Sequence, residues 1–498
     1  MNFQNTKWLS HPKILEINTW SWLYDLSERY NYPITLQNVP DEVLDKEISL
    51  FDVVWLMGVW ERSPKGREIA LDHPDLQEEY RQALRYFNTD DVVGSPYAVH
   101  YYHVDSHLGG QEGLIRIRKQ LATRGILLLL DYVPNHVAVD HIWTLEKSDI
   151  FIQGTLEEQM AQPYHFFSVG DQVYAHGLDP NFFENPWTDT IQINAFSKEA
   201  RQKTINTLLN IAEQCDGVRC DMAMLLINEV FKRTWGERGG KPLEKEFWRE
   251  VIPAVKEKSP NFKFIAEVYW DLEWELQQQG FDYCYDKKLY ERLIHDDARS
   301  IQTHLMADWD YQSKLVRFIE NHDEQRAVKV FGERKSRAAA IIILTLPGAH
   351  LIHEGQTRGY TIKLPIQLRR RPMEENNAEL IVFYNKLLKI IPGKELGKVQ
   401  WSLCKVEPVG KDASYENLIA YIWEINNLRQ LTVVNFSTYL TQGHIRIRGL
   451  HYGSNNWTFT DLLTQKKYTY KGEDLDNYGL YVDLDAWEGH IFDMKKND

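Results

Sequence analysis

The chain has 498 residues, a formal net charge of −14 and a sequence pI near 5.7, and 43% of its residues are hydrophobic. This length is too great for one ordinary hydrophobic core and predicts two or three domains. The acidic balance argues against nucleic acid or an anionic membrane as a partner, and no apolar stretch is long enough to span a membrane.

The first residues lack a basic region followed by an apolar one, so we expect no secretory signal and predict a cytoplasmic location. The four cysteines form neither a CxxC pair nor a cluster at zinc spacing. We expect them to be reduced thiols, because disulfides are uncommon without an export signal. No glycine-rich phosphate motif follows any predicted strand, and we expect no cofactor.

Apolar, strand-like runs alternate with helix-like runs over most of the chain. Strands are predicted at 13–18, 51–59, 126–133, 217–222, 262–268, 280–286, 315–323 and 349–355. Helices are predicted at 111–125, 197–216, 245–260 and 336–348, the second with Ser197 as its N-cap. The alternation indicates βα units, and a count near eight favours a closed (β/α)8 TIM barrel over an open sheet.

Two segments interrupt this alternation. Residues 137–194 form a long, aromatic and irregular stretch, which predicts an inserted B domain after the third strand. After residue 393 the chain becomes rich in short strand-like runs separated by turn residues, which predicts a C-terminal antiparallel β-sandwich. The expected domains are therefore a barrel (1–136 and 195–393), an inserted B domain (137–194) and a β-sandwich domain (394–498).

Polar residues recur where the predicted barrel strands end, and in such a barrel the active site lies at those carboxyl ends. They are Asp131, Asn135 and His136 after the third strand, Arg219 and Asp221 on the fourth, Glu267 on the fifth, and His322, Asp323 and Arg326 on the seventh. Each residue alone has an ordinary interpretation: a helix cap or turn former, a core histidine, or a solvated arginine. Their recurrence at successive strand ends favours a site.

Glycosidic bond cleavage fits these residues, because it needs one carboxylate as nucleophile or base and one carboxylic acid as proton donor. Arg219 precedes Asp221 by two residues, so both side chains lie on one side of the strand and the cation keeps the carboxylate ionised. Glu267 lies in an apolar stretch, and a dry environment would raise its pKa as a general acid requires.

The chain resembles the α-amylase family, glycoside hydrolase family 13. "DYVPNH" (131–136), "GVRCDMAML" (217–225), "FIAEVYW" (264–270) and "FIENHD" (318–323) resemble its four signature regions, in order, and "GSPYAVHYYHVDSHLGG" (94–110) is similar to its segment after the second strand. The resemblance implies a retaining hydrolase of α-glucans or α-gluco-oligosaccharides. Asp221 would be the nucleophile, Glu267 the general acid and then base, and Asp323 the residue that holds two sugar hydroxyls.

The resemblance also implies residues that bind the substrate. Tyr97 would stack on the glucose, His136 and His322 would hydrogen-bond it, and Arg219 would orient the nucleophile. Arg326 and Trp270 are further candidates, Trp270 as a stacking residue near the leaving group or, equally, as loop packing. The implied roles of Asp131 and Asn135 are structural.

Two departures from the family pattern lead to further expectations. Met224 and Leu225 stand where many members carry Lys-His, which predicts an apolar acceptor side. Gln192 stands where calcium-dependent members carry an aspartate ligand, so we expect no metal at the family's usual calcium site. Asn135 would then bond to backbone, and aromatic packing from 165–167 and 181–187 would hold the inserted domain.

Two other functions fit the same pattern. A transglycosidase would share every one of these residues and would differ only in whether water or a sugar accepts the glucosyl group. A non-catalytic carbohydrate-binding barrel is the alternative of a different class, and the presence of all three carboxylates argues against it.

Overall fold

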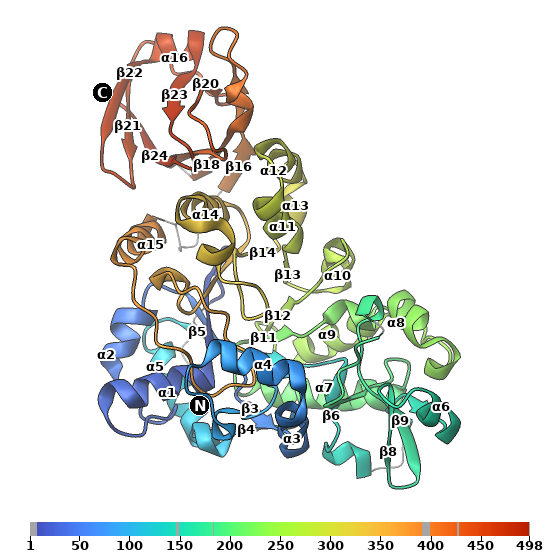
Figure 1. Cartoon of the computed structure of the whole chain (residues 1–498). Helices are drawn as coiled ribbons and strands as arrows, with labels where there is room; N and C mark the ends of the chain where they lie inside the picture. Colours follow the sequence, from blue (N-terminus) through green and yellow to red (C-terminus); the bar gives the residue numbers. More distant parts are fainter. Residues whose placement is uncertain (1–6, 146–148, 183, 391–398, 426–427, 498) are drawn as a thin grey trace. The chain divides into compact units, whose positions relative to one another are not determined.

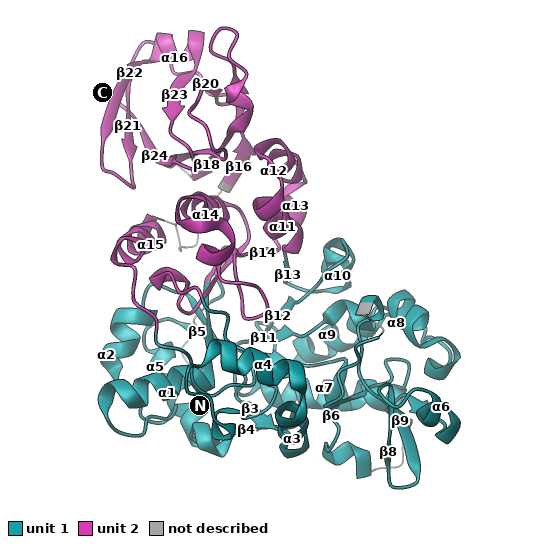
Figure 2. Cartoon of the chain, viewed as in Figure 1, with its two compact units in different colours: residues 1–8, 14–285, 362–373 teal, residues 9–13, 286–361, 374–498 magenta. Residues whose placement is uncertain are grey.

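The computed structural model describes residues 7–145, 149–182, 184–390, 399–425 and 428–497. The chain divides into two compact units (Figure 2). Unit 1 comprises residues 1–8, 14–285 and 362–373, and unit 2 comprises residues 9–13, 286–361 and 374–498. The domain boundaries expected from the sequence stay predictions, and the one at 393/394 lies outside the described residues.

Eight parallel strands form a closed barrel, as predicted, in the order β1-β15-β14-β13-β12-β11-β5-β2. Figure 1 labels β5, β11, β12, β13 and β14. Their bounds are β1 (Lys13–Asn18), β2 (Val53–Met57), β5 (Leu127–Tyr132), β11 (Gly217–Cys220), β12 (Lys263–Ala266), β13 (Tyr283–Tyr285), β14 (Leu315–Arg317) and β15 (Ala349–His353). Every residue of β2, β5 and β11 is buried, which explains their nearly continuous apolar sequences, because a parallel sheet is covered on both faces.

Helices alternate with the barrel strands along the chain. They are α1 (Thr19–Tyr30), α2 (Asp41–Val43), α3 (Pro64–Asp72), α4 (Pro74–Ala83), α5 (Gly110–Ala122), α7 (Lys198–Ala212), α8 (Asn228–Trp235), α9 (Phe247–Lys258), α10 (Glu273–Gln279), α11 (Lys287–His295), α12 (Ala298–His304), α13 (Trp309–Gln312), α14 (Ala327–Thr345) and α15 (Ala378–Ile390). The predicted cap of α7 is confirmed, since the Ser197 hydroxyl accepts a hydrogen bond from the Ala200 N–H.

The segment after β5 is more regular than the sequence analysis expected. It contains β6 (His136–Ala138), β7 (Gln153–Gly154), α6 (Leu156–Ala161), β8 (Phe166–Val169), β9 (Gln172–Ala175) and β10 (Thr190–Gln192). Strands β7, β9 and β8 form an antiparallel sheet, and β6 pairs with β10. The missed signal is a hairpin: Gly170 adopts φ 58° between β8 and β9, in a Gly-Asp turn flanked by strand-forming residues.

Buried apolar residues from the ends and middle of this segment pack together as Val137, Ile150, Phe151, Tyr174, Ile191, Ile193 and Ala200. Phe167, from the predicted aromatic stretch 165–167, packs against this cluster. Its ring also stacks on that of His176 at 4.4 Å between centroids. The side chains of residues 182 and 183, in the second predicted stretch, lie outside the described residues.

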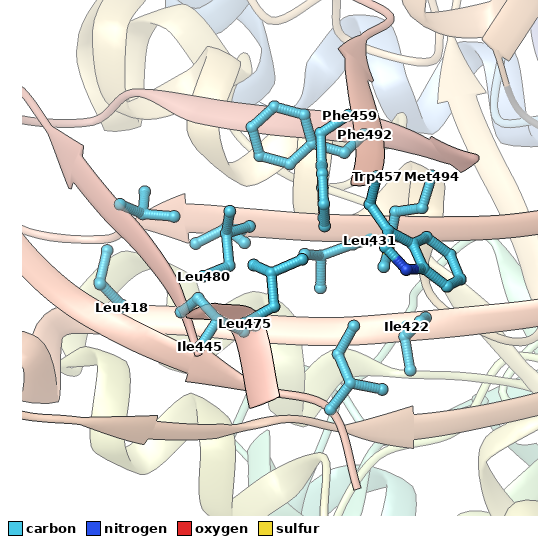
Figure 3. Close-up of a cluster of buried hydrophobic side chains, with 14 of the residues drawn as sticks. Leu418, Ile422, Leu431, Ile445, Trp457, Phe459, Leu475, Leu480, Phe492 and Met494 are labelled. Carbon is cyan, nitrogen blue, oxygen red and sulfur yellow. The ribbon is translucent and has the colours of Figure 1, made fainter. Parts of the chain in front are cut away.

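The C-terminal part of unit 2 confirms the predicted antiparallel β domain. One sheet has the order β16 (Val399–Leu403), β18 (Leu418–Ile425), β19 (Leu428–Asn435), β24 (Gly489–Lys496), β21 (Asn456–Asp461), β22 (Lys467–Lys471), and the other β17 (Lys405–Glu407), β20 (Thr441–Arg446), β23 (Leu480–Leu484). Helix α16 (Gly472–Tyr478) precedes β23. Figure 3 shows the shared core, in which Trp457, Phe459 and Phe492 are all buried.

None of the helices in the described part of the chain has the length and apolar character needed to cross a bilayer.

Candidate active site

The two carboxylates that the sequence singles out leave neighbouring barrel strands at the same end. Strands β11 and β12 pair in parallel with Cys220 opposite Ala266, and Asp221 and Glu267 follow these residues directly. The Glu267 N–H donates to the Cys220 carbonyl at 3.0 Å, which continues the ladder past the strand ends. The parallel register therefore places both acids beside each other.

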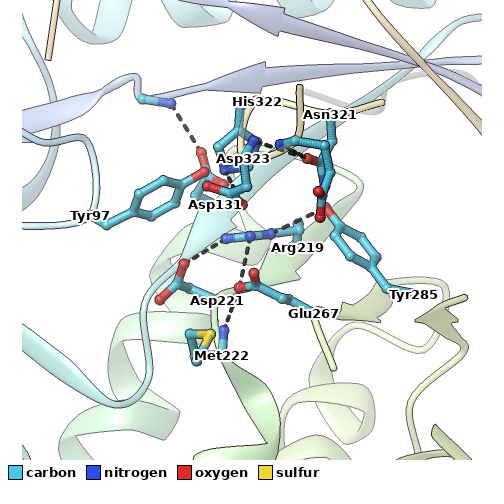
Figure 4. Close-up of polar contacts among 12 residues, drawn as sticks. Tyr97, Asp131, Arg219, Asp221, Met222, Glu267, Tyr285, Asn321, His322 and Asp323 are labelled. Atoms are coloured by element: carbon cyan, nitrogen blue, oxygen red, sulfur yellow. Dashed lines mark hydrogen bonds and ion pairs between the residues drawn. The ribbon is translucent and has the colours of Figure 1, made fainter. Parts of the chain in front are cut away.

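Arg219 contacts both carboxylates at once. Its Nη1 lies 2.8 Å from Asp221 Oδ1 and its Nη2 lies 2.8 Å from Glu267 Oε2, as the dashed lines in Figure 4 show. All three side chains are almost fully buried. A buried charge needs such partners, since desolvation without them costs several kcal/mol. This geometry explains why the sequence places an arginine inside an apolar strand.

Three aromatic rings surround the guanidinium. Its carbon lies 5.4 Å from the ring centroid of Trp55, 5.1 Å from that of Tyr97 and 5.7 Å from that of Tyr285. Burial by itself would lower the pKa of Arg219, but Glu267 and the other nearby acidic groups raise it well above its ordinary value. Arg219 is therefore a permanent cation. Tyr97 is predicted from the sequence as a ring that stacks on the sugar, which stays a prediction, and neither Trp55 nor Tyr285 is among the predicted residues.

Glu267 accepts two further hydrogen bonds that the sequence analysis did not anticipate. The Met222 N–H donates to Oε2 at 2.7 Å, and the Tyr269 hydroxyl donates to Oε1 at 2.7 Å. Met222 adopts φ 42°, an uncommon conformation for a residue with a side chain. Tyr269 could have been found by the argument used for Arg219, because residues two apart in an extended segment point to the same side.

Asp131 lies on β5 opposite Arg219 of β11 and is buried. Its carboxylate accepts from the Trp55 indole N–H at 3.2 Å and from the Gly58 N–H at 3.0 Å, and its carbonyl accepts from the Trp60 indole at 2.7 Å. These bonds join the ends of β5 and β2.

His136 is buried near the start of the inserted segment, with its ring 5.0 Å from that of Trp187. Burial lowers its pKa to about 3, and a hydrogen bond with the backbone of Tyr97 offsets only part of that effect. The imidazole is therefore neutral at neutral pH, with one nitrogen as a donor and the other as an acceptor.

Asn135 bonds to a side chain, so the expectation that it bonds to backbone instead is wrong. Its Nδ2 donates to Gln192 Oε1 at 3.1 Å, and Gln192 Nε2 donates to Asn135 Oδ1 at 2.9 Å. Gln192 Nε2 also donates to the carbonyls of Asn135 and Ile193, both at 2.9 Å. The two amides form a reciprocal pair because each carries both a donor and an acceptor.

This amide pair does not fit a calcium ion. Calcium binds carboxylate and carbonyl oxygens, whereas here Gln192 Nε2 occupies the side-chain and backbone oxygens of Asn135 with hydrogen-bond donors. Within the described residues, no group of three or more His, Cys, Asp or Glu side chains is arranged to hold a metal ion.

Unit 2 contains His322, Asp323 and Arg326. His322 is buried and its Nε2 lies 3.0 Å from Asp323 Oδ2, while the Asp323 side chain keeps 39% of its surface exposed. Arg326 is buried, so its interpretation as a solvated charge is wrong. Its Nη1 donates to Glu320 Oε1 and to the Glu354 carbonyl, both at 2.7 Å.

The residues three and four positions after Asp221 are more deeply buried than the one three positions after Glu267. Met224 and Leu225 are buried, so their side chains pack in the interior, and the expectation that they give the acceptor side an apolar surface is wrong. Trp270 is half-buried, and both it and Asp271 have positive φ, 65° and 58°. Two consecutive positive values in residues with side chains mark a strained turn three residues after Glu267.

The fold and this strand-end cluster define a class of protein, the (β/α)8 barrels with paired carboxylates at their strand ends. Residues 91–383, more than half of the chain, match the family described as "Alpha amylase, catalytic domain". The chain therefore belongs to the α-amylase family, as the sequence resemblance predicted.

Curated relatives share limited identity with this chain. The chain is 23% identical to alpha-amylase MalA of Haloarcula japonica over 68% of its own length and 47% of the relative's. It is 21% identical to an intracellular maltogenic amylase of Bacillus subtilis over 61% of its length and 51% of the relative's. It thus spans about half the length of the curated relatives it matches.

Solved structures resemble the chain over nearly its whole length. A noncanonic maltogenic alpha-amylase AmyB from Thermotoga neapolitana matches with a TM-score of 0.67 and 18% identity, covering 97% of this chain and 99% of that one. An alpha-amylase from Geobacillus thermoleovorans, complexed with acarbose, matches with a TM-score of 0.68 and 16% identity, covering 98% and 99%. At these identities the likeness shows the fold.

Proposed function

We propose that this chain is a retaining α-glycoside hydrolase that acts on α-glucans or α-gluco-oligosaccharides through a covalent glucosyl-enzyme on Asp221. The observation that carries the proposal is the pair of buried carboxylates, Asp221 and Glu267, each 2.8 Å from one nitrogen of the same guanidinium. A retaining glycosidase needs two carboxyl groups roughly 5–5.5 Å apart, and two acids that share one planar cation are held close together.

In the first half of the reaction, Asp221 attacks the anomeric carbon while Glu267 donates its proton to the glycosidic oxygen. The bond between the anomeric carbon and that oxygen breaks, and the leaving sugar departs with the proton. In the second half, Glu267 as carboxylate takes a proton from water, and the resulting hydroxide attacks the anomeric carbon. Asp221 is released, and the product keeps the α configuration.

Other residues would bind the sugar. Asp323 accepts hydrogen bonds from the 2- and 3-hydroxyls, and its exposed side chain is open to a ligand. The neutral His136 hydrogen-bonds the same glucose, as does His322, and Tyr97 stacks on it with the ring face that does not contact Arg219. Trp270 offers a ring to the leaving sugar from its strained turn, and Arg326 supports the fourth signature region through its buried contacts with Glu320 and Glu354.

The names of related proteins support α-glucan as the substrate class. They include alpha-amylases, maltogenic amylases and an alpha-glucosidase, and one similar structure holds acarbose. One relative is named intracellular, in line with the cytoplasmic location that the sequence predicts. Both the substrate and the location stay proposals for this chain.

Product analysis tests the proposal. The purified chain is incubated separately with maltose, maltoheptaose, glycogen, sucrose and trehalose, and the products are separated by chromatography. Proton NMR during the first minutes reports the anomer that is released, and Asp221→Asn is the matched control. We expect shorter sugars, released as the α anomer, from at least one α-glucan.

Three results would contradict this proposal. Release of the β anomer would exclude the retaining mechanism. Products longer than the substrate would indicate the transglycosidase, and binding without turnover would indicate a carbohydrate-binding barrel.

A further inference from the structure

We infer that Tyr269 is the positioning residue of Glu267: its hydroxyl holds Oε1 and adapts to the protonated and ionised states through which Glu267 must pass. The inference deepens the proposed function, on which it rests for the role of Glu267. Its geometric basis is the distribution of hydrogen-bond partners between the two oxygens of that carboxyl group.

Two donor groups lie against Glu267 Oε2. The Met222 N–H lies 2.7 Å from it, and the Arg219 Nη2 lies 2.8 Å from it. A backbone N–H and a guanidinium have no lone pair to offer, so neither can accept a hydrogen bond. A proton on Oε2 would point at these donors, and it would cost the hydrogen bond from Met222 and the ion pair with Arg219. The acidic proton of Glu267 therefore resides on Oε1.

Oε1 has a partner of a different kind. The Tyr269 hydroxyl, 2.7 Å away, donates to Oε1 in the ionised state. A phenol also carries acceptor lone pairs, so the same group can accept from Oε1–H once Glu267 is protonated. Rotation of one O–H bond is the only change required, and neither residue has to move.

This asymmetry assigns each oxygen a task. Oε2 anchors the side chain to Arg219 and to the strained backbone at Met222. Oε1 carries the proton, which turns from the Tyr269 hydroxyl to the leaving oxygen when a substrate is bound, and it later removes a proton from water. Tyr269 keeps Oε1 aimed in both halves of the reaction, and its hydrogen bond is stronger to the ionised form, because hydrogen bonds to a charged acceptor exceed neutral ones.

Tyr269→Phe tests the inference, because it removes only the hydroxyl. Loss of a donor to the carboxylate raises the pKa of Glu267, so we expect its titration midpoint to move upward by about one pH unit. That midpoint is read by NMR of the chain labelled with ¹³C at glutamate carboxyls, with Glu267→Gln identifying the signal. The matched control is Tyr384→Phe, which removes a buried hydroxyl bonded to Gln356 elsewhere in the chain.

Activity gives a second readout. With maltoheptaose, we expect kcat to fall roughly tenfold while KM stays within about twofold, because the acid is misaligned and binding is not. The basic limb of kcat/KM, where Glu267 loses its proton, should move to higher pH by the same amount as the midpoint. A 4-nitrophenyl α-maltoside, whose leaving group needs little protonation, should lose less in its first half-reaction.

The carboxyl titration and the activity measurement distinguish a failure of the inference about Tyr269 from a failure of the proposed function. The carboxyl titration uses the free chain, so it reports on Tyr269 even if no glucan is cleaved, an outcome that would overturn the proposed function alone. An unchanged Glu267 midpoint in Tyr269→Phe overturns the inference, whatever the activity. An equal shift in Tyr384→Phe does so as well, because it would show a general effect of losing a hydroxyl.

Discussion

Arg219 shows at the scale of one residue how a buried charge can organise a site. Each of its contacts with Asp221 and Glu267 is short, and three aromatic rings exclude water around it. A cation 2.8 Å from both acids favours their charged forms. Glu267, as the acid that protonates the leaving group, must therefore gain its proton close to this cation. The hydrogen bond between Tyr269 and Glu267 Oε1 is important for that reason.

Asp221→Asn should abolish hydrolysis of α-glucans and leave the fold intact. The amide keeps the size of the carboxylate and can still contact Arg219, but it cannot attack the anomeric carbon. We expect kcat to fall by at least about 10³-fold, since nucleophile and acid act as a unit. Initial rates on maltoheptaose measure the loss, and an unchanged melting temperature excludes unfolding. Substantial residual activity would show that another group is the nucleophile.

Glu267→Gln should discriminate between substrates. Natural α-glucans need the leaving oxygen protonated, whereas a 4-nitrophenyl leaving group departs with little help. We expect the first half-reaction to be strongly impaired for maltotriose, measured as released sugar in quenched-flow experiments. It should be nearly preserved for 4-nitrophenyl α-maltoside, measured as a burst of nitrophenol in rapid-mixing experiments. Equal loss on both substrates would argue against Glu267 as the acid.

Elements, rather than single residues, determine whether the inserted segment needs an ion. Strands β6 and β10 pair through Gln192 opposite His136, and the adjacent Asn135 forms the reciprocal amide pair with Gln192. Gln192 is completely buried, and one Nε2 contacts three oxygens of the neighbouring backbone and side chain. In this way protein donors do what a bound cation would do for the same oxygens.

Exhaustive chelation should therefore leave the chain unchanged. Dialysis against excess chelator is expected to alter neither the melting temperature nor the activity, and added calcium should restore nothing because nothing is lost. Activity and melting temperature with and without calcium are the measurements. A large loss that calcium reverses would contradict the assignment of this site to the amide pair.

Gln192→Met should destabilise the chain, because it keeps the approximate side-chain length and leaves the oxygens and the amide of Asn135 without these partners. A buried group left unsatisfied costs about 1–3 kcal/mol, and we expect a loss of unfolding free energy of that order or somewhat more. Gln202→Met on the exposed face of α7 is the control, with an expected change near zero. Denaturant unfolding measures the free energy of unfolding of both variants. An equal change in the two variants would contradict a stabilising role of the amide pair.

The sequence predicted the barrel strands and the position of Asp221 and Glu267 at neighbouring strand ends, because buried parallel strands and polar residues at their ends leave strong local patterns. It failed where the outcome depends on packing. Whether Met224 and Leu225 line a surface or fill the interior cannot be deduced from their apolar character. The partner of Asn135 depends on the register of β6 with β10, and Tyr285 reaches Arg219 from a strand distant in sequence.

At the scale of the whole molecule, buried histidines determine how stability depends on pH. Burial lowers the pKa of His136, His141 and His350 to about 3, and that of His11 and His176 to about 4, from the ordinary 6.5. The folded chain keeps all five neutral, whereas the unfolded chain protonates them below pH 6.5. The unfolded state thus binds more protons, and the free energy of unfolding falls as pH falls from about 6.5 towards 3–4.

Carboxyl groups with raised pKa act in the opposite direction. Burial raises the pKa of Asp189 from 3.8 to about 6, so below pH 6 the folded state binds a proton that the unfolded state does not yet hold. This one group offsets about one histidine over that range. Because five histidines oppose it, we expect a net loss of stability on acidification, measured by denaturant unfolding at pH 7, 6, 5 and 4.5.

His176→Gln isolates one of these contributions. His176 belongs to the inserted segment, where its Nδ1 lies 2.7 Å from the Thr190 carbonyl and its ring stacks on Phe167. Glutamine can donate to the same carbonyl but takes up no proton on unfolding. Between pH 6 and 4.5, the slope of unfolding free energy against pH should be shallower than in the parent by up to one proton, about 1.4 kcal/mol per pH unit.

The variant should be less stable than the parent at pH 7, through lost packing, and should lose that disadvantage as the pH falls. Parallel slopes for the two proteins would show that His176 does not bind its proton on unfolding, and the assignment of the acid sensitivity to buried neutral imidazoles would fail for this residue.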